Sequence, residues 1–355
     1  MAGIHLVTGH DYEQLGSFLA HFPDERQGQD FWLDRLRYWW DSNPAFSDST
    51  PRGWMANDED KIVGFIANIP TALKVADQEL MAYNASSWRV LPEFRSNSLG
   101  LMFKLLQASS KSVLFDATAS GEIVPIIRGL GFAPLSELSD TRSVAITGLD
   151  KIASLKLKLG PLPAGLLRTV VSPFNRIAPL GLRRLKPVSG LDVKSLNHAD
   201  EGFDQLWERT KNQYHATNVR TAKVINWYCF GSSIRRKELF ACYRGTQLLG
   251  YMVCIDHKTA QTRPLECVDL WVDSNDLEVA RALLSEAAAY ATRNRCGYLS
   301  VAHINSFTKQ ICDKLGMLSR SGRETNEFFK APKTLAQSVV RPDSYFVRAQ
   351  GDYGL

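Results

Sequence analysis

The first 228 residues contain no cysteine, and the six cysteines that follow form no C-x-x-C pair (Cys229, Cys242, Cys254, Cys267, Cys296 and Cys312). Structural zinc sites and disulfide frameworks need closer or paired spacings, so this pattern argues against both. Several of these cysteines lie in apolar, strand-like runs, where cysteine usually serves as a small core residue. The sequence therefore predicts no metal ion and cysteines that pack in the core.

No apolar run approaches the roughly 18 residues that a membrane span requires. The start, Met-Ala-Gly-Ile-His, lacks a basic region followed by an apolar core, so it does not resemble a secretory signal. The net charge of +5 is modest, and it does not indicate a nucleic-acid partner. We therefore expect a cytoplasmic globular protein, and 355 residues suit two domains.

Acidic residues are absent from residues 151–190, which hold eight Lys or Arg together with repeated Pro and Gly. This composition predicts a linker between a first domain, residues 1–150, and a second domain, residues 191–355. Three interpretations remain open: a linker packed on the domains, a membrane-surface contact, or a docking patch for an acidic partner such as an acyl carrier protein.

The first domain is organised around residues 90–100, Val-Leu-Pro-Glu-Phe-Arg-Ser-Asn-Ser-Leu-Gly. A strand is predicted before this loop over residues 81–90, and apolar spacing predicts a helix after it over residues 99–109. Further strands are predicted over residues 53–56, 61–69, 72–75, 113–116 and 142–147. A further helix is predicted over residues 122–130. Trp32, Leu36 and Trp39 share one face of another helix at core-facing spacing. The fold class is α+β, a mixed and largely antiparallel sheet flanked by helices.

The loop lies at a strand-to-helix corner, which is a favourable place for an anion. The first backbone N–H groups of a helix have no intrahelical partner and carry partial positive charge. A phosphate placed there gains hydrogen bonds and a favourable dipole. Arg95 adds a fixed positive charge to the same corner.

The second domain repeats landmarks of the first at a nearly constant offset. Three pairs of residues are separated by 186, 183 and 185 positions: Gly64 and Gly250, Trp88 and Trp271, and Gly131 and Gly316. Such agreement favours an internal duplication.

The strand, the Arg95-to-Gly100 loop, the helix and the later Gly131-Phe132 pair resemble the GNAT superfamily of N-acetyltransferases. The resemblance covers nearly the whole chain as two tandem domains, the second a degenerate copy. It implies that acetyl-CoA or another acyl-CoA binds domain one, with its pyrophosphate on the loop and its thioester along the edge of strand 86–90. The implied cofactor-binding residues are Ser87, Trp88, Val90, Arg95, Ser96, Asn97, Ser98, Leu99 and Gly100. Ser98 stands where the family usually has glycine.

Acyl transfer needs a neutral acceptor amine, a route for its proton and stabilisation of an oxyanion. The family often places a tyrosine acid where this sequence has Ile127. Candidate bases are Glu79, Asp41 and Asp116, and candidate acceptor-binding residues are Asn43, Asn84, Ser86 and Thr118. For each of them, an ordinary hydrogen-bonded role in a strand or turn remains an equal alternative.

Domain two has Asp273, Asp276 and Glu278 at the equivalent corner, where like charge would repel a pyrophosphate. We therefore predict a cytoplasmic acyltransferase that moves an acyl group from acyl-CoA to an amine of a small molecule, sugar or peptide, or alternatively to a hydroxyl. Two rivals remain: an aminoacyl-tRNA-dependent peptidyl transferase, as some tandem GNAT-like proteins are, and a non-enzymatic binding or scaffold protein.

Overall fold

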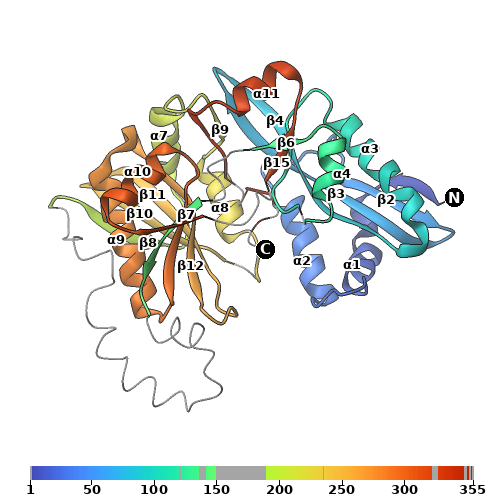
Figure 1. The fold of residues 1–355 in the computed structure, drawn as a ribbon, viewed down its shortest axis with the longest axis horizontal. Coiled ribbons are helices and arrows are strands. Elements are labelled where there is room, and N and C mark those ends of the chain that lie inside the picture. Colours follow the sequence, from blue (N-terminus) through green and yellow to red (C-terminus); the bar gives the residue numbers. More distant parts are fainter. Residues whose placement is uncertain are drawn as a thin grey trace, which may run out of the picture. The chain divides into compact units, whose positions relative to one another are not determined.

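The computed structural model describes residues 2–119, 121–135, 141–148, 189–234, 236–321, 327–347, 350–351 and 353 (Figure 1). The chain divides into two compact units, each with segments from both halves of the sequence. Unit 1 comprises Met1–Glu137, Tyr214–Arg236 and Thr325–Leu355; unit 2 comprises Leu138–Gln213 and Lys237–Glu324. The units therefore do not follow the predicted boundaries at residues 150 and 191.

Unit 1 is built on a mixed, largely antiparallel sheet. Its described strands are β1 (Gly3–Leu6), β2 (Gly53–Asp58), β3 (Lys61–Val75), β4 (Gln78–Val90), β5 (Leu114–Asp116), β6 (Ala133–Pro134), β9 (Ala216–Asn218), β15 (Phe328–Lys330) and β16 (Ser344–Tyr345). The main order is β1-β2-β3-β4-β5-β15-β6, and β9 pairs with β3 and β16. The parallel pairs are β4 with β5 and β9 with β16.

Helices cover both faces of this sheet. They are α1 (Tyr12–Ala20), α2 (Gln29–Trp39), α3 (Ser98–Ala108), α4 (Val124–Gly129), α8 (Ala222–Phe230) and α11 (Lys333–Val339), with 3₁₀ turns η1 (Gly9–Asp11) and η2 (Pro92–Asn97). Figure 1 shows α1 and α2 on one side of the sheet and α3 and α4 on the other. Trp32, Leu36 and Trp39 are all buried, which confirms their predicted core role.

Strand β3 runs unbroken through Pro70, although two strands were predicted, 61–69 and 72–75. Proline lacks an N–H, so it is tolerated where no neighbouring strand needs that donor. Pairing of β3 with β2 ends at Ala67, and pairing with β9 begins at Leu73. The Asn43 side chain occupies part of this gap and donates a hydrogen bond to the Pro70 carbonyl (2.9 Å).

Unit 2 has a second mixed sheet with helices of its own. Its described strands are β7 (Thr141–Ile146), β8 (Asp192–Leu196), β10 (Glu238–Arg244), β11 (Gln247–Asp256), β12 (Pro264–Val272), β13 (Tyr298–Ala302) and β14 (Leu318–Ser321). Their order is β14-β7-β13-β12-β11-β10-β8. The helices are α7 (Glu201–Thr210), α9 (Leu277–Arg293) and α10 (Ser306–Lys314), and η3 (Asp273–Asn275) is a 3₁₀ turn.

The two sheets exchange one strand each. Strand β7 was predicted to complete the first domain, but it pairs with β13 and β14 of unit 2. Strand β15, close to the end of the chain, instead pairs with β5 and β6 of unit 1. The predicted membership of β7 was wrong because alternation of apolar residues identifies a strand but carries no information about a distant partner.

All six cysteines are buried and free of disulfide bonds, as their apolar surroundings predicted. Nearly all of the predicted basic linker, with its expected membrane or carrier-protein contacts, lies outside the described residues. Within the described ranges, every helix is too short or too polar to traverse a bilayer. The same ranges contain no group of three or more His, Cys, Asp or Glu side chains arranged to hold a metal ion.

Candidate functional site

The candidate site of unit 1 begins where β4 and β5 part. Their parallel pairing comprises Tyr83 opposite Leu114 and Asn84 opposite Phe115. Strand β4 continues beyond this point to Val90, and β5 ends one residue later at Asp116. The strands therefore form a fork, with Asn84 at its root and the β4 backbone from residue 85 onward along one arm.

A β-bulge reorients the backbone on that arm. The register between β3 and β4 passes from Phe65 opposite Arg89 to Ala67 opposite Ser86, so Ser87 and Trp88 share the place of one residue. Ser87 has a left-handed backbone, with φ of 49°. A bulge leaves a backbone group out of the ladder and is common beside active sites, and left-handed residues other than glycine cost about 1–3 kcal/mol. This strained residue lies on the edge predicted to carry the thioester.

The corner after β4 is built from η2 followed directly by α3. Trp88 Nε1 donates a hydrogen bond to the Ser98 carbonyl (3.2 Å), and the Ser98 amide donates to the Arg95 carbonyl. Trp88 therefore fixes the shape of the corner. A Cβ at Gly100 would approach Ile4 Cδ1 to 2.8 Å, so a larger residue there would require the end of the Ile4 side chain to move.

The start of α3 carries no acidic side chain in its first turn, and no side chain accepts a hydrogen bond from its terminal amides. Arg95 and Ser96 are exposed beside it, whereas Asn97 is buried. No side chain therefore competes with an anion at the positive end of the α3 dipole. These residues were predicted as a pyrophosphate site, and their geometry is compatible with that role.

The corresponding corner of unit 2 already contains its own anion. Asp276 Oδ1 accepts hydrogen bonds from the amides of Glu278 (2.8 Å) and Val279 (3.4 Å), the second and third residues of α9. Asp273 is paired with Arg209 at 2.9 Å. A phosphate would have to displace a covalently attached carboxylate here. That unit 2 binds no cofactor stays a prediction.

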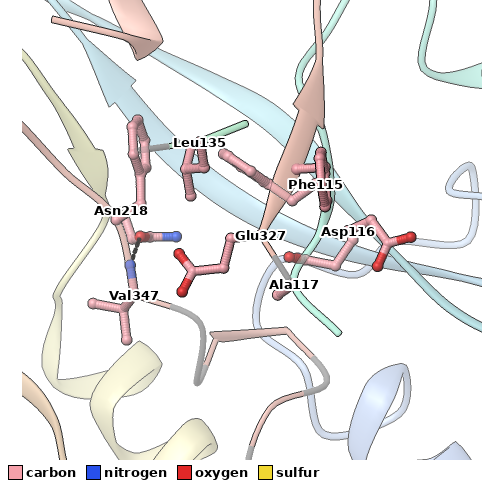
Figure 2. A pocket seen from close by; sticks show the side chains of 10 residues that line it. Phe115, Asp116, Ala117, Leu135, Asn218, Glu327 and Val347 are labelled. Carbon is pink, nitrogen blue, oxygen red and sulfur yellow. Dashed lines mark hydrogen bonds between the residues drawn. The ribbon is translucent and has the colours of Figure 1, made fainter. Parts of the chain in front are cut away.

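A small pocket that opens to solvent lies at the root of the fork in unit 1. Its lining side chains, drawn in Figure 2, come from six separate segments of the chain. They are Asn84, Phe115, Asp116, Ala117, Leu135, Asn218, Glu327, Phe328, Phe346 and Val347. Six of the ten are apolar, two are amides and two are carboxylates.

Asp116 is a titratable group of this pocket in a perturbed environment. Burial raises its pKa to about 6, and a hydrogen bond from the Thr118 amide to Oδ1 (3.3 Å) acts in the opposite direction. A carboxylate with a pKa near 6 is ionised at neutral pH and is still basic enough to accept a proton. Asp116 is thus the predicted base that the structure brings to the pocket.

The other predicted catalytic and acceptor residues are distributed differently. Asn84 lines the pocket and Ser86 is buried on the fork. Glu79 is exposed near the opposite end of β4, facing Lys74 in the ladder, so it does not reach the fork. Thr118 contributes its backbone amide to Asp116.

Asp41 and Asn43 hold the turn after α2 and do not line the pocket. Asp41 accepts a hydrogen bond from the Tyr12 hydroxyl (2.8 Å) and lies 3.9 Å from Arg52. Asn43 is buried, donates to the Trp39 and Pro70 carbonyls and accepts from the Ala45 amide. With its donor and acceptor both occupied, Asn43 stabilises the turn rather than offering groups to a ligand.

Sequence reasoning missed Asn218, Glu327 and Phe346, which complete the pocket. Asn218 lies on β9, Glu327 precedes β15, and Phe346 follows β16. Each is remote in sequence from the β4 corner, and no local motif marks it. Only the pairing of β15 with β5 brings Glu327 to the same pocket as Asp116.

The fold is that of solved GCN5-related N-acetyltransferase structures, and the matching region covers most of this chain. A GCN5-related N-acetyltransferase from Anabaena variabilis is 13% identical, with 93% of this chain and 72% of that chain covered and a TM-score of 0.59. A probable N-acyltransferase from Enterococcus faecalis is 11% identical, with coverage of 93% and 73% and a TM-score of 0.59. N-myristoyltransferase from Saccharomyces cerevisiae, solved with bound myristoyl-CoA, is 13% identical, with coverage of 92% and 81% and a TM-score of 0.53. No protein-family model and no curated protein matches the chain.

Proposed function

We propose that the chain is an acyltransferase that moves an acyl group from acyl-CoA to an amine, with donor and acceptor both bound by unit 1. The observation that carries this proposal is the fork between β4 and β5, which opens between the uncapped start of α3 and the pocket of Asp116. Structural likeness to N-acetyltransferases and to an N-myristoyltransferase with bound myristoyl-CoA supports the same class of reaction.

The donor would bind along the arm of the fork. Its pyrophosphate would meet the α3 amides and the Arg95 guanidinium, and its thioester would follow the β4 edge near the bulge at Ser87. Backbone amides turned out of a ladder are suitable donors to a developing oxyanion. The serine at position 98 adds a hydroxyl to this corner, where it can donate to a phosphate oxygen.

Asp116 would then act as the proton acceptor. The amine nitrogen forms a bond to the acyl carbon, the carbon–sulfur bond breaks, and the amine proton passes to the Asp116 carboxylate directly or through water. The sulfur leaves as the CoA thiol after taking a proton from water, since Ile127 is fully buried in the core and supplies no acid. This division of roles needs no metal ion.

Two measurements test the proposal. Thiol release from acetyl-CoA and longer acyl-CoAs is followed with mixed primary amines, and transfer is expected only when both substrates are present. CoA binding is measured by calorimetry for the wild type, Arg95→Glu and Lys111→Glu. Lys111 is an exposed cation beyond the other end of α3, so its reversal controls for charge alone.

Arg95→Glu is expected to weaken CoA binding by about tenfold or more, because it places a negative charge beside the phosphates. Lys111→Glu should bind nearly as the wild type does. Equal affinities of the wild type and Arg95→Glu would contradict the proposed donor site, and the absence of transfer with every acyl-CoA would favour a binding or scaffold role.

A further inference from the structure

The outward face of α3 carries two exposed apolar side chains. Leu99 and Phe103 lie one turn apart, at i and i+4, so they are neighbours on this face. Leu99 is 47% exposed, and Phe103, at 56%, is the most exposed large apolar side chain of the described residues. Leu101, Met102 and Leu105 are buried in the core of unit 1. The helix therefore has apolar residues on both faces, whereas the outward face of a surface helix is usually polar.

The edge strand β1 extends this apolar surface. A Cβ at Gly100 would lie 2.8 Å from Ile4 Cδ1, so β1 passes beside the start of α3. Leu6 is two residues further along β1 and therefore lies on the same face of the sheet as Ile4. Leu6 is 51% exposed, and β1 is the outermost strand at its end of the sheet.

Cations accompany these apolar side chains. Arg95, Lys104 and Lys111 are all exposed, and residues 94–115 contain these three cations and no Asp or Glu. Within the described part of the chain, none of the three is ion-paired. Exposed apolar side chains with a polar rim mark interaction sites, and this positive charge complements an acidic partner. We name this surface the α3 patch, which comprises Leu6, Arg95, Leu99, Phe103, Lys104 and Lys111.

The charge of the α3 patch argues against a second copy of the chain as its partner. In a two-fold dimer the patch would meet itself, so the cations of one copy would face those of the other. Like charges brought together at an interface cost free energy. An acidic surface would instead meet these cations with complementary charge.

The α3 patch adjoins the corner that we propose for the phosphates of the donor. Leu99 directly follows Ser98, the first residue of α3, and Arg95 belongs both to the corner and to the patch. A partner seated on the patch can therefore reach the fork between β4 and β5 with a flexible arm. This placement favours a protein that delivers the acyl group.

We infer that the α3 patch docks an acidic carrier protein whose acyl group is attached to a phosphopantetheine arm. The phosphate of the arm lies at the α3 start, and its thioester reaches the fork as that of acyl-CoA would. The amine nitrogen bonds to the acyl carbon and gives up its proton, the carbon–sulfur bond breaks, and the arm leaves as a protonated thiol. This inference deepens the proposed function by naming the partner that supplies the acyl group. It rests on that function for the reaction but not for the docking.

The experiment measures docking without any reaction. A purified acyl carrier protein of bacterial fatty-acid synthesis, in its holo form without an acyl group, is titrated into the chain by calorimetry. Wild type should bind it with a Kd of about 10–100 μM at about 25 mM salt. The affinity should fall about tenfold at about 200 mM salt, because the attraction between exposed charges is screened.

Two substitutions test the two components of the α3 patch. Lys104→Glu should weaken carrier binding by about tenfold or more, and Phe103→Ser by about fivefold or more. Both should leave the affinity for CoA nearly unchanged, since neither residue belongs to the corner at the α3 start. Lys333→Glu and Val340→Ser change exposed residues at the two ends of α11, and these matched controls should bind the carrier as the wild type does.

The inference is overturned if the carrier fails to bind, if Lys104→Glu and Phe103→Ser bind it as the controls do, or if both weaken CoA binding equally. If the carrier is not bound and the two substitutions instead abolish a dimer in ultracentrifugation, the patch belongs to a second copy. If they abolish sedimentation with vesicles of phosphatidylglycerol and phosphatidylcholine, it belongs to a lipid surface.

The inference and the proposed function can fail separately. Docking of the carrier on the α3 patch, without acyl transfer from the acylated carrier or from acyl-CoA, would support the inference and refute the proposed function. Transfer from acyl-CoA by a chain that does not bind the carrier would do the reverse.

Discussion

Asp116 of β5 and Phe328 of β15 lie directly opposite each other in an antiparallel pair. The pair joins a strand near the first third of the chain to one near its end, and it brings Glu327 into the pocket that Asp116 lines. The chemistry proposed for unit 1 therefore depends on a contact between distant segments.

Asp116 should govern the acid limb of the pH–rate profile. Because burial raises its pKa to about 6, kcat/KM for an amine acceptor is expected to rise with pH as the carboxyl ionises and to level off above pH 7. Steady-state rates from pH 5 to 8 should show this limb in the wild type and lose it in Asp116→Asn, whose kcat should fall by about 100-fold or more. If Asp116→Asn kept the pH–rate profile of the wild type, a residue other than Asp116 would be the base.

The same substitution is expected to stabilise the fold at neutral pH. A carboxyl whose pKa is raised on folding favours the folded state at low pH, and this contribution is lost as pH rises through the folded value of about 6. Asparagine carries no charge to desolvate, so Asp116→Asn should raise the free energy of unfolding by about 1–3 kcal/mol at pH 8. Urea denaturation should show little difference between the proteins near pH 4. A variant that is less stable at pH 8 would contradict the cause assigned to this pKa.

One CoA should bind per chain. No side chain caps the α3 start, whereas Asp276 caps the α9 start. Calorimetry should give a stoichiometry near one in the wild type and in Asp276→Asn, because the asparagine oxygen can still cap the helix. Arg95→Glu should reduce the affinity of this single site. A second site abolished by changes near Asp276 would show that unit 2 also binds the donor.

Gly351 is expected to be intolerant of even one added methyl group. A Cβ there would lie 2.6 Å from Asn84 Oδ1, so either Asn84 or the adjoining chain must shift. Gly351→Ala should cost about 1–3 kcal/mol of stability and raise KM for the acceptor more than for the donor. Gly121→Ala serves as the control, since its added Cβ would meet nothing within 4 Å. Equal acceptor KM in both variants would place Asn84 outside the acceptor site.

The exchanged strands make a further prediction for fragments of the chain. Residues 1–150 contain β7 but lack β15, and residues 191–355 contain β15 but lack β7. Each fragment alone should therefore fail to show a cooperative unfolding transition, because a sheet strand is missing and an edge is exposed. Co-expression should recover a complex with such a transition. A cooperatively folded fragment 1–150 would show that β15 is dispensable.

Much of unit 1 could be predicted from the sequence because its signals are local. The strand over residues 81–90, the loop and the following helix correspond to β4, η2 and α3, and Asp116 was among the predicted bases. Periodicity and helix-start chemistry depend on neighbouring residues, so both can be read from one segment.

The rest of the fold and most of the pocket lining could not be predicted, because they depend on pairing between segments that are distant in the sequence. The sequence gives no sign that Phe328 faces Asp116, and therefore none that Glu327 and Asn218 line the pocket. Asp41 and Asn43 have the right chemistry for a site, but their hydrogen bonds to Tyr12, Trp39 and Pro70 use it to hold a turn. The same kinds of polar side chain can form a binding site or stabilise a turn, and only their contacts in the structure distinguish the two roles.

The exchange of β7 and β15 also sets an order of events during synthesis. On the ribosome, β5 emerges long before Phe328–Lys330, the strand that covers its edge. An uncovered strand edge is a template for pairing with another chain, and translation at about 5–20 residues per second leaves that edge open for many seconds. The β5 edge of the nascent chain therefore stays open to pairing with other chains until Phe328–Lys330 has been made.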